Sequence, residues 1–361
     1  MGNWKNGELG DFVTLKRGFD LPQQKREDGQ VPIFSSSGIT GTHSTAMVKA
    51  PGVITGRYGT IGEVFYAAKD FWPLNTTLFV EDFHGNDAKF IYYFLKTLEW
   101  SKFTSASAVP GINRNTVHKE IVSLPDVETQ RRIASTLSMF DEKIKINTEI
   151  NDNLQQQAMS LYAEMFLNSS DSNVTSGTLS DIAVITMGQS PSGSSYNEDG
   201  VGEVFYQGRA EFGFRFPKRR LFTTEPKRMA EAGDVLLSVR APVGDLNIAY
   251  ERCCIGRGLG AIHSKTGHSS FVLYTMFALR SQLDVFNGEG TVFGSINRDA
   301  LNAIPIDIPP VTEIDQFEVV AHPIDELIRA NYEENCRLEA IRDSLLPKLV
   351  SGEIDVSAVQ L

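Results

Sequence analysis

Residues that could carry out catalysis are scattered along this sequence rather than gathered in a motif. No Gly-x-x-x-x-Gly-Lys-Ser/Thr stretch is present, so the chain lacks the loop that cradles the phosphates of ATP. Its six histidines and three cysteines show no metal-binding spacing. Asp126, Asp141 and Lys143 have a spacing found in nuclease metal sites, but the last two fall in a helical pattern, and such a site needs a strand. We therefore expect no catalytic residue, no bound metal and no cofactor.

Basic and aromatic residues gather in one stretch of the second half of the chain. Six basic residues lie from Arg215 to Arg228, against a single acidic residue, Glu225. Interleaved with them or beside them are Phe212, Phe214, Phe216 and Phe222. This composition is typical of a surface that contacts phosphate groups. A solvated pair of strands beside half-buried aromatic rings explains the same run.

Charge is distributed unevenly along the chain. The net charge of −11 and the pI near 5.1 by themselves argue against a polyanionic partner. However, residues 1–127 have a net charge of 0 and residues 168–311 of −2, so the remaining segments carry −9 of the total. The two large blocks are therefore close to neutral.

Length and composition indicate a globular protein of two domains. The chain has 361 residues, of which 41% are hydrophobic. Three cysteines cannot build a disulfide framework, so we expect reduced thiols and a cytoplasmic location. No apolar run has the length of a membrane-spanning helix, and the first residues lack the apolar core of a secretion signal. We expect no association with a membrane.

The sequence repeats itself at a shift of 184 residues. Residues 112–161 and 296–345 share 14 identities in 50 positions without a gap. The identical residues include Ile112-Asn113-Arg114 with Ile296-Asn297-Arg298, and Asp141-Glu142 with Asp325-Glu326. The chain is therefore a duplication in which a variable block and a helical block each occur twice.

Each helical block carries the heptad pattern of a coiled coil. Apolar residues and two asparagines follow alternating steps of four and three from Ile133 to Met165, and the shift of 184 gives a corresponding seam from Phe317 to Leu349. Prolines precede both blocks, and Glu128 and Glu313 lie in the first turns. The pattern predicts two helices of about 40 residues, each about 60 Å long.

Two asparagines lie at the middle of each seam: Asn147 and Asn151 in the first, Asn331 and Asn335 in the second. Asparagine at a core position of a coiled coil costs stability and fixes register. If the helices pair antiparallel about a pseudo-two-fold axis, these polar layers coincide only when Asn147 faces Asn335 and Asn151 faces Asn331. We predict this register.

The variable blocks have the pattern of α+β domains. Short β-type runs at 31–34, 62–66 and 235–239 are separated by Gly, Pro and Ser, and amphipathic stretches follow near 88–98 and 271–283. We predict α+β globular domains at 1–125 and 168–310, long helices at 126–167 and 311–350, and a tail at 351–361. Residues 169–177 have the composition of a polar linker.

Several stretches, in this order, resemble the specificity subunit of type I restriction–modification enzymes. They are Leu124–Ala134 before the first long helix, Met187–Gly193, Gly233–Gly244 and Gly256–Ile262. The resemblance covers essentially the whole chain. One departure is Glu313-Ile314, where the family usually has Glu-Gln.

The resemblance implies a fold and a function. Each variable block would be a target recognition domain that reads one half of a bipartite double-stranded DNA sequence. The antiparallel helices would set the spacing between the half-sites and dock two modification subunits, which are adenine methyltransferases. S-adenosylmethionine and the ATP-driven restriction motor would belong to partner subunits, and this chain would bind without catalysing.

Individual DNA contacts are predicted in Gly-rich loops and in the basic run. Arginine can read guanine, and arginine or lysine can hold phosphates. The candidates are Arg57, Tyr58, Arg209, Arg215, Lys218, Arg219 and Arg240. A structural ion pair explains Arg57 or Arg240 as well as a DNA contact does. Asn113 and Asn297 are expected to cap helices rather than read bases.

Two alternative functions remain. One is a nuclease or methyltransferase, which turnover by the purified chain with DNA, S-adenosylmethionine and Mg²⁺ would reveal. The other is a coiled-coil scaffold that does not bind specific DNA sequences. If the resemblance holds, the near-neutral blocks predict that the isolated chain binds DNA poorly and that its partners supply basic surface.

Overall fold

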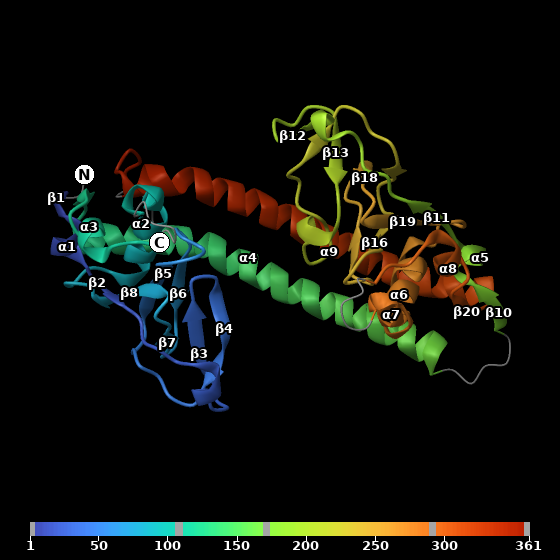
Figure 1. The fold of residues 1–361 in the computed structure, drawn as a ribbon, viewed down its shortest axis with the longest axis horizontal. Coiled ribbons are helices and arrows are strands. Elements are labelled where there is room, and N and C mark those ends of the chain that lie inside the picture. The colour runs from blue at the N-terminus through green and yellow to red at the C-terminus, as the bar shows by residue number, and fades with distance from the viewer. Residues whose placement is uncertain (1–3, 105–110, 169–173, 289–293, 357–361) are drawn as a thin grey trace. The chain divides into compact units, whose positions relative to one another are not determined.

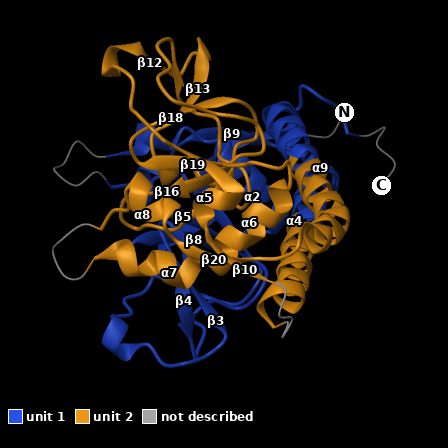
Figure 2. Ribbon diagram, turned by 90° about the vertical axis from the view of Figure 1, so that its right-hand side faces the viewer, with its two compact units in different colours: residues 1–147, 333–361 blue, residues 148–332 orange. Residues whose placement is uncertain are grey.

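Two compact units make up the structure, which is a computed structural model (Figures 1 and 2). The first comprises Met1–Asn147 and Glu333–Leu361, and the second Thr148–Tyr332. The structure describes residues 4–104, 111–168, 174–288 and 294–356. Each unit therefore combines one variable block with parts of both long helices.

An antiparallel sheet with the order β2-β8-β5-β6 forms the body of the first unit. Its strands are β2 (Thr14–Arg17), β8 (Thr77–Asp82), β5 (Gly52–Gly56) and β6 (Val64–Ala67). Side chains alternate between the faces of a strand. Accordingly, Val53 of β5 packs in the same core as helix α2 (Ala88–Lys96), whereas Ile54 packs in an aromatic cluster with Phe34 and Phe71.

Smaller elements complete the first unit. Strand β3 (Val31–Ser35) forms a hairpin with β4 (Gly38–His43) and pairs in parallel with β7 (Trp72–Pro73). Strand β1 (Lys5–Glu8) pairs with β9 (Ile121–Leu124), which joins the two ends of the variable block. The short helices are α1 (Leu9–Phe12), α3 (Arg114–Val117), η1 (Gln23–Lys25) and η2 (Trp100–Phe103).

The second unit repeats this plan. Its antiparallel sheet has the order β11-β19-β16-β17, and β10 pairs with β20 as β1 pairs with β9. The strands are β10 (Thr175–Thr178), β11 (Ala183–Met187), β16 (Val235–Ser238), β17 (Leu246–Ile248), β19 (Leu259–Ser264) and β20 (Pro305–Ile308). The helices are α5 (Leu179–Ile182), α6 (Ser269–Ala278), α7 (Arg280–Asp284) and α8 (Arg298–Asn302).

A second sheet in this unit has the order β12-β14-β13-β18-β15 and is larger than its counterpart in the first unit. Its strands are β12 (Tyr196–Asn197), β13 (Glu203–Tyr206), β14 (Phe222–Thr223), β15 (Met229–Ala230) and β18 (Cys253–Ile255). Short helical turns are η4 (Gly193–Ser195), η5 (Arg209–Glu211) and η6 (Val285–Asn287).

The same local signals begin the short helices of both units. Glu8 with Asp11 and Thr178 with Asp181 form capping boxes at α1 and α5. The side chain of Asn113 accepts a hydrogen bond at the start of α3, and that of Asn297 does so at the start of α8. The predicted capping role of both asparagines is confirmed.

The two long helices are α4 (Val127–Tyr162), which continues into a π-helical turn η3 (Ala163–Leu167), and α9 (Val311–Val350). They pair antiparallel within each unit. In the first, Leu137 of α4 shares a core with Leu346 of α9; in the second, Tyr162 of α4 packs on Phe317 of α9. The predicted fold class, with α+β domains and two long antiparallel helices, is confirmed.

Three details differ from the expectations. Of the predicted linker, residues 169–173 lie outside the described residues, but residues 175–177 belong to β10, because pairing with β20 orders them. The stretch 271–283 forms two helices, α6 and α7, which meet at Leu279. The start of the predicted tail packs in the first core, where Val356 is buried; residues 357–361 are not described.

Candidate nucleic-acid interface

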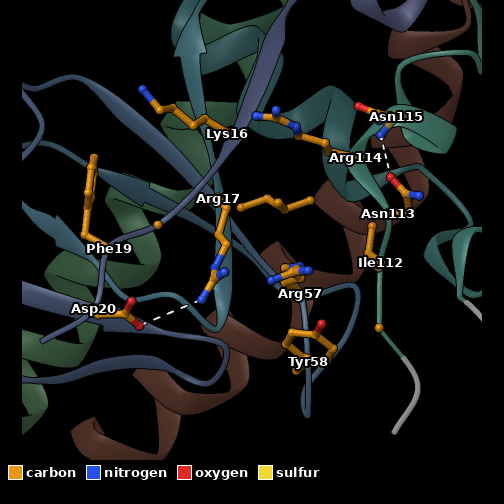
Figure 3. A pocket seen from close by; sticks show the side chains of 13 residues that line it. Lys16, Arg17, Phe19, Asp20, Arg57, Tyr58, Ile112, Asn113, Arg114 and Asn115 are labelled. Carbon is orange, nitrogen blue, oxygen red and sulfur yellow. Dashed lines mark hydrogen bonds and ion pairs between the residues drawn. The ribbon is translucent and has the colours of Figure 1, made fainter. Parts of the chain in front are cut away.

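A basic concavity of about 750 Å³ lies on the first unit, between β2, the loop after β5 and the start of α3 (Figure 3). Four basic side chains line it: Lys16, Arg17, Arg57 and Arg114. The other lining residues are Gly18, Phe19, Asp20, Tyr58, Leu78, Gly111, Ile112, Asn113 and Asn115. Cations around a space of this size form a site for an anion such as a phosphate.

The cations of this concavity are only partly neutralised by described residues. The guanidinium carbon of Arg57 lies 4.5 Å from the centroid of the Tyr58 ring, and Arg57 has no acidic partner among the described residues. Arg17 and Asp20 are 3.8 Å apart, with both side chains mostly exposed. Arg114 is exposed. Lys16 also pairs with Glu81, so a phosphate entering here would compete with two surface ion pairs, which are weak.

A second concavity, of about 550 Å³, lies on the second unit. Two exposed arginines, Arg240 and Arg257, line it. Met187, Val239, Ala241, Gly294, Ser295, Ile296 and Asn297 complete the lining. This concavity has fewer cations than the first.

Both concavities are built from the same repeated elements. The amide of Ile112 donates to the carbonyl of Arg57 (3.0 Å), and the amide of Ile296, 184 residues later, donates to the carbonyl of Val239 (3.1 Å). Tyr58 forms an isolated antiparallel β-bridge with Gly111, and Arg240 forms the same kind of bridge with Ser295, 184 residues after Gly111. Arg240 therefore corresponds to Tyr58 and not to Arg57, so the two arginines lie in the same loop but one position apart.

The structure contradicts the expectation that Arg215 contacts DNA. Arg215 is only 3% exposed, and its Nη1 lies 3.3 Å from Oδ1 of Asp325 on α9. Its Nη2 also donates to the hydroxyl of Tyr274. A phosphate cannot reach a guanidinium enclosed in this way. This ion pair gives Arg215 a structural role. Its partner lies 110 positions away in the sequence, so the local sequence does not indicate the pairing.

The rest of the basic run is also partly neutralised. Arg219 pairs with Glu251 (2.8 Å), and Arg209, which precedes the run, pairs with Asp245 (2.6 Å). Lys218 is exposed, and its backbone amide donates to Glu211. Arg209 and Arg219 keep exposed side chains, so a DNA contact remains sterically open to them, but they would have to share or exchange an acidic partner.

Three exposed arginines of the concavities, Arg17, Arg114 and Arg257, were not among the predicted contacts. The sequence contained a signal for two of them. Arg114 belongs to the repeated Ile-Asn-Arg triplet, and Arg257 to a Gly-Arg-Gly turn of the same form as the Gly-Arg-Tyr-Gly loop that contains Arg57. Arg17 had no such signal, because only the folded sheet brings the end of β2 beside that loop.

The four asparagines at the middle of the long helices form two hydrogen-bonded pairs. Nδ2 of Asn147 donates to Oδ1 of Asn335 (2.9 Å), and Nδ2 of Asn331 donates to Oδ1 of Asn151 (2.8 Å). These are the facing pairs that the seam predicts. Nδ2 of Asn147 also donates to Glu334 (2.7 Å), and this bond is the main reason that the pKa of Glu334 lies below its usual value.

A tyrosine of each variable block is bonded to an aspartate of a long helix. The hydroxyl of Tyr93 in α2 donates to Asp141 in α4 (2.6 Å), and that of Tyr274 in α6 donates to Asp325 in α9 (2.8 Å). Burial raises the pKa of both tyrosines, so both hydroxyls remain protonated donors at neutral pH. Asp141 therefore has a structural partner on a helix, and its nuclease-like spacing is incidental.

Among the described residues, no group of three or more His, Cys, Asp or Glu side chains could hold a metal ion. None of the helices described is long and apolar enough to cross a membrane.

The fold has two tandem α+β domains, each with a cation-lined concavity and each packed on the paired long helices. This arrangement is that of a protein with two nucleic-acid-binding domains. A model of the type I restriction modification DNA specificity domain matches residues 1–156 and again residues 171–335. The chain therefore belongs to the type I restriction–modification DNA specificity family, with two specificity domains in tandem.

Individual relatives agree with this assignment. The chain is 31% identical over 290 residues to a protein described as the MjaX type I restriction enzyme specificity subunit of Methanocaldococcus jannaschii, covering 74% of this chain and 68% of the relative. It is 23% identical over 308 residues to the MjaIX specificity subunit of the same organism, covering 75% and 70%. In fold, it resembles the S subunit of a type I restriction–modification system from M. genitalium, with a TM-score of 0.61, 19% identity and coverage of 97% and 96%.

Proposed function

We propose that this chain is the non-catalytic specificity subunit of a type I restriction–modification complex in the cytoplasm. Each recognition domain reads one half of a bipartite double-stranded DNA target, and the long helices keep the two readers at a fixed spacing. Two adenine methyltransferase subunits dock on the helices, and restriction subunits with an ATP-driven motor join the complex. S-adenosylmethionine and ATP bind to those partners.

The repetition of a cation-lined concavity at equivalent places of the two domains carries this proposal. Two readers of the same fold with different lining residues can recognise two different half-sites. Arg57, with Arg17 and Arg114 beside it, contacts DNA in the first domain, and Tyr58 lies where a base or sugar can pack on its ring. Arg240 and Arg257 take this role in the second. Lys218, Arg209 and Arg219 lie outside both concavities and contact flanking phosphates.

Exposed apolar residues on the long helices support the docking of partner subunits. Met139 and Ile146 of α4 are 52% and 50% exposed, and Val320 and Leu327 of α9 are 49% and 47% exposed. A separation of seven residues places each pair on one face of its helix. Apolar side chains repeated in this way on a solvent-facing surface are typical of protein interfaces.

The distribution of charge explains why partners are needed for tight binding. The recognition blocks are close to neutral, and the helices are acidic. Because phosphate neutralisation supplies much of the affinity for DNA, the isolated chain binds weakly, and the methyltransferase subunits contribute basic surface.

A selection from random duplexes tests the function. The complex with methyltransferase subunits modifies a library of duplexes in which both the bases and the spacer vary, and the methylated sites are sequenced. We expect two short fixed motifs at one spacing. Arg57→Ala relaxes the selection at one half-site only, and Arg240→Ala relaxes it at the other. Arg252→Ala, which removes an ion-paired arginine outside the concavities, is the matched control.

Other outcomes separate the alternatives. Methylation without a common motif supports a scaffold that does not read sequence. Turnover of DNA by the purified chain alone, with S-adenosylmethionine and Mg²⁺, supports an enzyme and overturns the proposal.

A further inference from the structure

The tyrosine–aspartate bond between a recognition domain and a long helix occurs in both halves at equivalent positions. Asp141 and Asp325 are aligned by the 184-residue repeat, and Tyr93 and Tyr274 are each the sixth residue of their helix. The bonds are 2.6 Å and 2.8 Å long. The aspartates belong to the repeated helical blocks, whereas the tyrosines occur in variable blocks that otherwise differ in sequence. A shared mechanical role explains why both blocks have the pair.

Both bonds are well shielded from water. The tyrosines are 0% and 1% exposed, and the aspartate side chains are 25% and 14% exposed. A hydrogen bond to a charged carboxylate is about twice as strong as one between neutral groups, and its direction is specific. The apolar contacts around it do not have such directionality. Each bond therefore fixes the position of its recognition domain along the helix.

The required precision is that of a base pair. Sliding a domain by one residue along a helix moves it about 1.5 Å, and by one turn about 5.4 Å, whereas successive base pairs are about 3.4 Å apart. A slip of one turn would change the reach of a reading domain by more than one base pair. An apolar interface can repack after such a slip. A hydrogen bond to one carboxylate is broken by it.

A second partner holds each aspartate in place, and this partner differs between the halves. Asp141 pairs with Arg342 of α9 at 2.7 Å, so its site joins the domain to both long helices. Asp325 pairs instead with Arg215 of the recognition domain, so that domain holds α9 by two side chains. The neighbouring ring of Phe216 packs on Tyr332 of the same helix.

We propose that Asp141 and Asp325, with Tyr93 and Tyr274, are positioning residues for DNA specificity. They set the distance at which each domain reads its half-site and leave the identity of the bases that are read unchanged. This proposal rests on the function proposed above.

The test measures spacer preference and base preference separately. Tyr93→Phe and Tyr274→Phe, each in the complex with methyltransferase subunits, modify a duplex library with random half-sites and spacers of varied length. Phenylalanine keeps the ring and removes only the donor. We expect unchanged bases at both half-sites and at least a fivefold loss of preference for the wild-type spacer over spacers one base pair longer or shorter.

Matched variants exclude a general loss of stability. Tyr92→Phe changes the tyrosine next to Tyr93, whose hydroxyl accepts from Lys96 at 3.5 Å. Tyr206→Phe is the control for the second unit, where its hydroxyl donates to a backbone carbonyl. Both should keep the wild-type spacer preference. Asp141→Asn retains an oxygen that accepts from Tyr93 but loses the ion pair with Arg342, so it should keep part of the preference, whereas Asp141→Ala should lose it.

Three results would overturn the proposal. The first is a wild-type spacer preference in Tyr93→Phe and Tyr274→Phe. The second is altered bases at a half-site, which would make the pair a determinant of base reading. The third is a wild-type complex without any bipartite motif, and only this result also contradicts the proposed function. Thermal unfolding of every variant shows whether a variant with an altered spacer preference is still folded.

Discussion

Asn147 and Asn335 face each other across the two long helices, with Nδ2 of the first 2.9 Å from Oδ1 of the second. The bond from Asn331 to Asn151 is its equivalent under the 184-residue repeat. In each pair, the accepting asparagine also donates to a backbone carbonyl, of Ile144 or of Ile328. The duplication has thus conserved a network that specifies one register of the helices.

Replacing one member of this layer should destabilise the protein, and replacing both should not. Asn147→Leu leaves Asn335 without its donor, and we expect a loss of about 1–3 kcal/mol in the free energy of unfolding. Asn147→Leu combined with Asn335→Leu removes both polar groups and should recover this loss, because an apolar pair packs without unmet hydrogen bonds. Urea denaturation of the three proteins measures both values. A double variant less stable than the single one would contradict the expected coupling.

Removal of the Asp325 carboxylate should be among the most damaging single changes in the second unit. Burial raises the pKa of Asp325 despite the opposing effect of Arg215, so the intact ion pair contributes little net stability. Asp325→Ala nevertheless leaves Arg215 charged and enclosed, and we expect a loss of about 3–5 kcal/mol.

Calorimetry or urea denaturation of Asp325→Ala can be compared with Glu198→Ala. Glu198 pairs with Arg220 at the surface, where both side chains are more than half exposed, and its loss should cost less than about 1 kcal/mol. Arg215→Met in the Asp325→Leu background should restore most of the stability. Equal losses for Asp325→Ala and Glu198→Ala would show that Arg215 is solvated in solution.

The long helices and the asparagine register could be predicted from sequence because a heptad seam is a local, periodic signal. The hydrogen bonds of Asp141 and Asp325 could not be predicted, since they join residues 48 and 51 positions apart in the sequence. In addition, Asp141 resembled part of a metal-binding motif. The predicted DNA contact of Arg215 was wrong for the same reason. A basic run predicts exposed side chains, and only the fold brings the buried partner Asp325 next to Arg215. Most short strands, such as β12 and β15, are ordered by pairing rather than by their own pattern.

The salt dependence of DNA binding should separate phosphate contacts from base contacts. If Arg57 holds a phosphate, Arg57→Ala lowers the slope of log K against log salt concentration by about 1, with a similar loss for all sequences. If it reads a base, specificity at one position falls with little change in slope. Titration of the complex with labelled duplexes at several salt concentrations measures both. Lys49→Ala, which removes a highly exposed lysine paired with Asp70, is the control, and an effect equal to that of Arg57→Ala would argue against a special role for the concavity.

Acid should weaken the middle of the helix pair through Glu334. The hydrogen bond from Asn147 and the nearby Lys143 (3.2 Å) hold the pKa of Glu334 below its usual value of 4.5. Because the folded state prefers the ionised carboxylate, this contribution to stability is complete above pH 4.5 and is lost as the pH falls through the lower folded value. Glu334→Gln keeps an oxygen that accepts from Asn147 but does not titrate. We therefore expect the melting temperature of the wild type to fall more steeply than that of Glu334→Gln between pH 5 and pH 3, measured by circular dichroism; parallel curves would show that Glu334 is not held by these partners in solution.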